Sequence, residues 1–190
     1  LKAMPIEEIP SLPEGYKIMM AGNIADGLGI ESLLSFFEEM KDVDEVKFIL
    51  VGGGNLQQKM VNECKKRRLD NVFFWGKQPY SKMPSFYEKA DAMLLTLKAT
   101  ALPHLDVTVP ARLQSYMAGG KPVLAMIGKG ASNLINEADC GHAVPAGDYK
   151  GLAAYIKKSV LNNRKEFSKK GQNGRIYYEK HFMKGECITN

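Results

Sequence analysis

Short apolar runs alternate with helix-like segments along most of the chain, and this alternation is the feature that most restricts its fold. The runs 16–21, 46–51 and 92–97 are largely apolar rather than apolar at every second position, as strands buried on both faces are. Apolar residues at helical spacing follow them, for instance over 30–40. Because such a β–α unit recurs about six times, we predict an α/β fold, a doubly wound parallel sheet of about six strands with helices on both faces.

The remaining strands and helices are predicted from the same alternation. Further strands are expected at 71–75, 122–126 and 142–144, and further helices at 56–68, 81–90, 133–138, 149–161 and 165–181. In sheets of this kind ligands bind beyond the carboxyl ends of the strands. The candidate binding loops are therefore the segments 22–29, 52–55, 76–80, 98–110 and 127–132.

The stretch from Thr108 to Ala125, TVPARLQSYMAGGKPVLA, predicts a helix that opens a binding site. Thr108 is expected to cap this helix and Pro110 to occupy its first turn. Free N–H groups at a helix start attract anions, so a phosphate-bearing ligand is expected there. Arg112 falls in the first turn, where its guanidinium can clamp a diphosphate. Ser115, one turn further, either hydrogen-bonds a ribose or is a small packing residue.

Two glycine-rich loops follow the first two strands, and each has two interpretations. The loop from Gly22 and Asn23 to Gly29 either lets a ligand approach its backbone or is a flexible turn. Its spacing is not that of the dinucleotide fingerprint. The run 52–54 also lacks the fingerprint's third glycine and the Lys-Ser/Thr of a phosphate-binding P-loop. A tight turn that relieves packing is the favoured interpretation there, with nucleotide contact as the alternative.

Other polar residues fall in the loops that follow later strands. Lys77 can meet a phosphate and the Gln78 amide can read a base edge, unless the segment is an ordinary surface turn. His104 and Asp106 lack a nucleophile beside them, which favours a solvent-facing histidine over acid–base chemistry. No spacing of His, Cys, Asp or Glu predicts a metal site.

Charge and cysteine content restrict the partners and the compartment. The net charge of +5 permits attraction to phosphate ligands or to an anionic membrane surface. The basic residues are dispersed, so a nucleic-acid partner is not expected. Three cysteines without metal spacing favour a reduced, cytoplasmic setting, and peripheral contact with the inner membrane face stays open. The proline-spaced segment 1–15 is expected to be an interdomain linker, with an N-terminal part missing and the domain proper over 16–190.

Six motifs in order resemble the C-terminal, donor-binding half of a GT-B-fold glycosyltransferase of the family 4 type. They are AGNIADGLGIESLL at 21–34, FILVGGG at 48–54, VFFWGKQP at 72–79, YEKADAMLL at 87–95, VPARLQSYMAGGKPVLA at 109–125 and ADCGHAVPAGD at 138–148. They are most similar to enzymes that build bacterial surface polysaccharides. The resemblance implies one Rossmann-like half of a two-domain enzyme whose donor lies in the cleft between the halves.

The resemblance also implies a function. The expected reaction transfers a hexosyl or N-acetylhexosaminyl group from a UDP-sugar to a polysaccharide or lipid-linked acceptor. The anomeric configuration is retained, and no metal or other cofactor is required. The acceptor would bind the missing N-terminal domain, so this domain alone would be inactive. The diphosphate is expected at the first glycine loop and at the segment from Val109 to Arg112, and the base near Lys77 and Gln78.

The sequence departs from the family at two glutamates near the start of the central helix. Val107 and Ser115 stand at these positions, and the second glutamate usually binds the donor ribose. The first glycine loop carries Asn23 and Leu28 where relatives carry Arg and Lys; Lys129 or Arg112 would compensate. Two alternatives therefore stay open: a catalytically degenerate binding or scaffold module, and a sugar-nucleotide epimerase-like domain.

Overall fold

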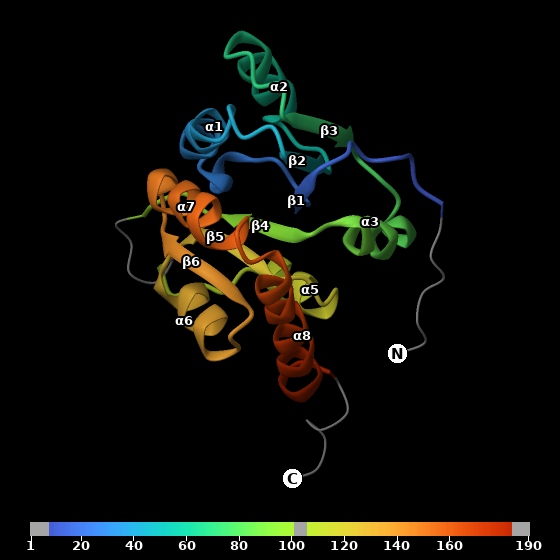
Figure 1. The fold of residues 1–190 in the computed structure, drawn as a ribbon, viewed down its shortest axis with the longest axis vertical. Helices are drawn as coiled ribbons and strands as arrows, with labels where there is room; N and C mark the ends of the chain where they lie inside the picture. The colour runs from blue at the N-terminus through green and yellow to red at the C-terminus, as the bar shows by residue number, and fades with distance from the viewer. Residues whose placement is uncertain (1–7, 101–105, 184–190) are drawn as a thin grey trace.

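A six-stranded parallel sheet forms the centre of the protein in the computed structural model, which describes residues 8–100 and 106–183 (Figure 1). The strands are β1 (Tyr16–Ala21), β2 (Val46–Val51), β3 (Val72–Gly76), β4 (Ala92–Thr96), β5 (Val123–Ile127) and β6 (Gly141–Pro145). Their order is β3-β2-β1-β4-β5-β6. The doubly wound α/β fold predicted from the sequence is confirmed, and the predicted bounds of β1 and β2 match the structure.

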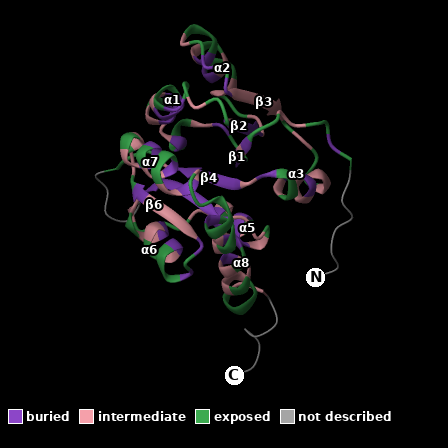
Figure 2. Cartoon of the chain, viewed as in Figure 1, coloured by how far each residue is buried: buried purple, intermediate pink, exposed green. Residues whose placement is uncertain are grey.

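Helices cover both faces of the sheet. They are α1 (Ile30–Glu39), α2 (Gln57–Lys66), α3 (Met83–Lys89), α5 (Ala111–Ala118), α6 (Lys129–Glu137), α7 (Tyr149–Tyr155) and α8 (Arg164–His181). Two short 3-10 helices, η1 (Asp26–Leu28) and η2 (Tyr80–Lys82), and one π-helical turn, η3 (Ile156–Val160), complete the regular structure. The four inner strands, β1, β2, β4 and β5, are the most deeply buried elements (Figure 2), which explains why their sequences lack a polar face, whereas the edge strands β3 and β6 are mostly half-buried.

Two hydrophobic cores lie on opposite faces of the sheet. On one face α1, α2 and α7 pack through residues such as Phe36, Met60 and Leu152. On the other face α3, α5 and α6 pack through residues such as Phe86, Met117 and Ile135. Alternate strand residues point to opposite faces, so Ile18 joins the first core and Met19 the second. Ile9, within the segment predicted to be a linker, is 6% exposed and packs against the second core.

Several helix boundaries differ from the predictions. The helix α5 begins at Ala111 with Pro110 as its N-cap residue, so the predicted cap at Thr108 is wrong. The helix α6 begins at Lys129, four residues before the expected start, because the Asp106 carboxylate accepts a hydrogen bond from the Lys129 N–H at 3.3 Å. The segment after Tyr149 is α-helical only to Tyr155 and continues as the π turn.

Candidate functional site

The site lies where the connections of the sheet reverse direction. From β1 the chain runs outward to β2 and β3 and then returns to β4 on the other side of β1. In open α/β sheets this reversal leaves a crevice at the carboxyl ends of the two central strands. A cavity of about 600 Å³ occurs at this edge. Its walls are the loops after β1, β2 and β3 together with parts of α3 and α5. We call it the carboxyl-edge cleft.

Arg112 lies directly over the backbone of the first glycine loop. Its Nη2 donates a hydrogen bond to the Asn23 carbonyl oxygen at 3.1 Å. A Cβ atom added at Gly22 would lie 2.9 Å from the same nitrogen and would displace the guanidinium, and the φ of +125° at Gly22 is one that side-chain-bearing residues rarely adopt. The guanidinium is therefore held at the cleft wall beside the start of α5, where the first N–H groups have no intrahelical partner. This corner of the cleft is suited to an anion.

The second glycine loop, residues 52–54, hydrogen-bonds to the first glycine loop and packs against it. The Ile24 N–H donates to the Gly53 carbonyl at 2.8 Å, and the Gly22 N–H donates to the Val51 carbonyl at 2.9 Å. A Cβ atom at Gly52 would lie 2.0 Å from the Gly22 carbonyl oxygen. These contacts agree with the interpretation that glycines here permit close packing. Residues 52–54 also line the cleft, so contact with a ligand stays a prediction.

Six of the eight residues predicted to bind the donor line this one cleft: Gly22, Asn23, Lys77, Gln78, Arg112 and Ser115. Lys77 is exposed, and its side chain passes beside Gly53. The Gln78 amide already donates to the Trp75 carbonyl at 2.7 Å, which fixes its orientation and leaves its side-chain oxygen as an acceptor. Ser115 is exposed on α5, one turn after Arg112. Their roles as ligand contacts stay predictions.

Thr108 and Val109 are not among the residues that line the cleft. Both are exposed in the segment that leads into α5. The start of this segment packs on the beginning of α6, where a Cβ at Gly130 would lie 2.1 Å from the carbonyl oxygen of the exposed Val107. Asp106 is used there in capping α6, and His104 lies outside the described residues.

An apolar wall faces the polar corner, and sequence reasoning missed it. It consists of Tyr80 from η2 and of Met83 and Tyr87 from α3. Tyr80 is 82% exposed. Burial, and then the neighbouring Tyr80, raise the pKa of Tyr87 to about 12, so its hydroxyl stays protonated at neutral pH. The aromatic residues that follow Pro79 were the sequence feature that could have predicted this wall, but their spacing also fits the buried face of an ordinary helix.

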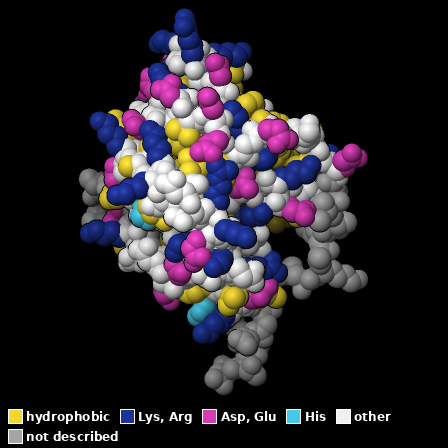
Figure 3. Space-filling model, viewed as in Figure 1, with side chains coloured by type: hydrophobic (Ala, Val, Ile, Leu, Met, Phe, Trp, Pro, Cys, Tyr) yellow, Lys and Arg dark blue, Asp and Glu magenta, His cyan; other side chains and the backbone are white. Residues whose placement is uncertain are grey.

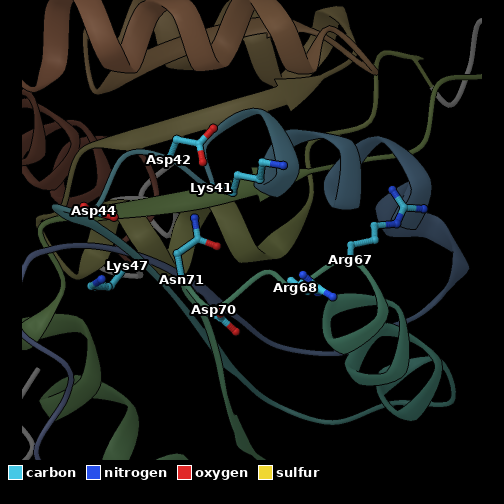
Figure 4. A pocket seen from close by; sticks show the side chains of 8 residues that line it. All are labelled: Lys41, Asp42, Asp44, Lys47, Arg67, Arg68, Asp70 and Asn71. Atoms are coloured by element: carbon cyan, nitrogen blue, oxygen red, sulfur yellow. The ribbon is translucent and has the colours of Figure 1, made fainter.

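A second hollow lies at the opposite, amino edge of β2 and β3 (Figure 4). Its lining residues are polar and mostly charged: Lys41, Asp42, Asp44, Lys47, Arg67, Arg68, Asp70 and Asn71. The side chains are spread around the hollow rather than gathered at one point. Arg67 is turned toward the α1 carboxylates of Glu31 and Glu38, at 3.3 and 3.4 Å. This mixture of charges is typical of a solvated surface, and it lacks the apolar wall of a small-molecule site.

Charged side chains, and the His, Cys, Asp and Glu side chains that could bind a metal ion, are dispersed in the described part of the chain. On the face seen in Figure 3, basic and acidic side chains are interspersed. Within residues 8–100 and 106–183, no three His, Cys, Asp or Glu side chains gather as a metal site would require. No helix in the described ranges is long and apolar enough to cross a membrane.

The topology and the cleft define a Rossmann-like α/β domain with a cavity at its topological switch point. The family model described as "Glycosyl transferases group 1" matches residues 6–176. The chain therefore belongs to this glycosyltransferase family, and the coarse family assignment made from the sequence motifs is confirmed.

Curated relatives agree with this assignment, and solved structures share the fold. The chain is 28% identical over 160 residues to a Pseudomonas aeruginosa protein named "Probable glycosyltransferase WbjE", covering 80% of this chain and 39% of that protein. Anabaena HepE, crystallised with UDP, superposes with a TM-score of 0.71 at 20% identity, over 89% of this chain and 45% of HepE. The C-terminal domain of Francisella tularensis LpcC has a TM-score of 0.70 at 17% identity, over 90% of this chain and 88% of that domain. The chain thus spans less than half of WbjE and of HepE.

Proposed function

We propose that this chain is the donor-binding half of a retaining glycosyltransferase of the family 4 type. The donor would be a UDP-linked hexose or N-acetylhexosamine, and the acceptor a polysaccharide or lipid-linked saccharide held by a separate N-terminal domain. One observation carries the proposal: Gly22, Lys77, Arg112 and Ser115 come from three separate segments, the loops after β1 and β3 and the helix α5, and meet at one cleft. The family match and the UDP complex of HepE support it.

In this proposal the diphosphate lies at the corner formed by Gly22, Asn23 and Arg112. The guanidinium matches a diphosphate because its donors form a planar fork that two oxygens can accept together. The exposed Lys77 adds a second positive charge from the other side of the cleft. Uracil lies beside the polar groups of Gln78 and the ring of Tyr80. Thr108 and Val109 do not contact the donor in this proposal, and they contribute only by leading the chain into the start of α5.

The chemistry follows from where charge develops. As the bond between the sugar C1 and the β-phosphate oxygen breaks, its electron pair stays on the diphosphate, and the sugar becomes oxocarbenium-like. Arg112 and the start of α5 stabilise the growing negative charge. The acceptor hydroxyl then attacks C1 on the face from which the diphosphate departs and gives its proton to the departing β-phosphate oxygen, so the configuration is retained.

Three further features belong to the same proposal. The leaving group obtains its positive charge from side chains and backbone, so no metal ion is invoked and EDTA should leave UDP binding unchanged. The chain by itself should bind donor without transferring sugar, because the acceptor wall is supplied by the other domain. We place the enzyme in the cytoplasm, with peripheral contact at the inner membrane face.

A second candidate function, a non-catalytic nucleotide-sugar-binding module, is favoured by one observation. The described residues that line the cleft include no carboxylate. Ser115 and Val107 stand where the family resemblance places glutamates. A full-length protein that binds UDP-sugar but neither transfers nor hydrolyses it would favour this candidate over the transferase.

Calorimetric titration of this chain with UDP, GDP and UDP-glucose tests the proposal. We expect UDP to bind, and Arg112→Ala to weaken UDP at least tenfold, because hydrogen bonds to charged groups contribute about 1.5–3 kcal/mol. Arg164→Ala is the matched control, since Arg164 pairs with Glu45 and lies over Tyr16 at the amino end of β1. Absence of UDP binding, or equal losses in both variants, would overturn the assignment.

A further inference from the structure

The acceptors that line the carboxyl-edge cleft are neutral. Its described lining includes Ser115, Asn23 and Gln78 but no Asp or Glu. Asp26, in the same loop as Asn23, is turned to Lys98, with 3.0 Å between carboxylate and ammonium. The hydroxyls of a bound pentose would therefore donate to neutral oxygens or to water. A charge-assisted hydrogen bond is roughly twice as strong as such a neutral one.

The groups that line the cleft match the parts of a nucleotide. Arg112 in the first turn of α5 lies over Gly22, at the polar corner. Ser115 is three residues on and therefore lies on the same helix face. The apolar wall from η2 and α3 lines the same cleft as these two side chains. The cleft thus brings together a cation, a hydroxyl and an aromatic surface.

In a nucleoside diphosphate the pentose joins the phosphates to the base. With the diphosphate at Arg112 and the base against the wall of Tyr80, Met83 and Tyr87, the pentose faces Ser115. This placement rests on the proposed function. Ser115 is exposed, so a pentose hydroxyl there exchanges one neutral hydrogen bond with water for another.

We propose that this cleft does not select for the ribose 2′-hydroxyl and binds 2′-deoxyribonucleoside diphosphates nearly as well as ribonucleoside diphosphates. Sugar donors linked to a deoxyribonucleotide, such as dTDP-sugars, therefore belong to its substrate class alongside UDP-sugars. The apolar wall is compatible with the additional methyl group of thymine, because Met83 and Tyr87 present hydrocarbon surface to the cleft.

Titration with UDP and with dUDP tests the inference, because these two ligands differ only in the 2′-hydroxyl. We expect their dissociation constants to agree within about fivefold, as the net effect of one solvent-exposed neutral hydrogen bond allows. A preference for UDP of more than about fivefold would overturn the inference while leaving the proposed function intact. Absence of binding by both ligands would overturn the proposed function itself, and this inference with it.

A gain-of-selectivity variant tests the placement of the pentose. Ser115→Glu introduces a carboxylate on an exposed helix position, and we expect it to increase the UDP-to-dUDP preference at least fivefold, because charge-assisted bonds are stronger. Ser168→Glu, at an exposed position of α8 outside the cleft lining, is the control and should leave the ratio unchanged. An unchanged ratio in Ser115→Glu would overturn the placement of the pentose at this residue.

Discussion

The phenol oxygen of Tyr116 satisfies both backbone groups of Ala21, accepting from its N–H at 3.0 Å and donating to its carbonyl at 3.1 Å. Ala21 is the last residue of β1, and β4 pairs with β1 only at Ile18 and Met19. The tyrosine thus takes the place of a neighbouring strand where the sheet opens into the cleft. It also fixes α5, and with it Arg112, against the first glycine loop.

Tyr116→Phe should destabilise the fold and loosen donor binding together. The variant leaves the buried N–H and carbonyl of Ala21 without this partner, which costs about 1–3 kcal/mol for such groups. Urea unfolding measures the loss, and UDP titration measures the effect on the cleft. Tyr177→Phe is the control, because its hydroxyl bonds the exposed Glu137 carboxylate at 2.9 Å and should change stability by less than about 0.5 kcal/mol. Equal effects in both variants would contradict the role given to Tyr116.

The contact between the two glycine loops gives a second prediction. Gly52 has a φ of +142°, and a Cβ there would overlap the Gly22 carbonyl oxygen. Gly52→Ala should therefore lower the free energy of unfolding by about 3 kcal/mol or more, because backbone strain and a steric clash add. Gly27→Ala is the matched control, since a Cβ at Gly27 meets nothing within 4 Å. Thermal melts of both variants provide the measurement, and a Gly52→Ala protein as stable as Gly27→Ala would contradict the packing argument.

The sequence predicted the sheet well because each strand carries its own signal. Runs such as Tyr16–Ala21 and Val46–Val51 are short and apolar, and they end at glycines, so composition alone fixes their type and length. The polar part of the cleft was predictable for a related reason. Residues placed after parallel strands must meet at the carboxyl edge, whatever the details of packing.

The features that were missed depend on contacts distant in sequence. The early start of α6 relies on Asp106, which is 23 residues before its partner Lys129. Pro110, rather than Thr108, became the N-cap residue of α5 because the preceding segment packs on α6 instead. The apolar wall was overlooked because Tyr80 and Tyr87 have the spacing of an ordinary helix face, and only the structure turns them toward Arg112.

The stacked pair of His142 and Tyr155 predicts how stability depends on pH. The two rings lie 3.5 Å apart between centroids at 10°, and burial together with the nearby Lys170 lowers the pKa of His142. Asp139, which is paired with Lys170, is the neighbouring carboxylate. Because the unfolded chain binds this proton more readily, stability should be complete above about pH 6.5 and fall as the pH drops below it.

Thermal melts between pH 7.5 and 5 test this linkage. His142→Phe keeps an aromatic ring on Tyr155 but removes the titrating group, so its melting temperature should fall less on acidification than that of the wild type. The quantity compared is the slope of melting temperature against pH, so a constant difference in stability between the two proteins does not affect the result. Parallel curves would show that another group governs the acid sensitivity.

Tyr80 offers a prediction that separates recognition of the base from recognition of the diphosphate. Its ring is 82% exposed at the cleft, so it is available to stack on a nucleobase. Tyr80→Ala should weaken UDP about tenfold, within the ~1–3 kcal/mol that base–aromatic stacking contributes. Inorganic pyrophosphate has no base, and its binding should be unchanged. Tyr80→Phe keeps the ring and should bind UDP like the wild type. A Tyr80→Ala protein that loses UDP and pyrophosphate equally would place the tyrosine at the phosphates instead, because the phosphates are the only part that the two ligands share.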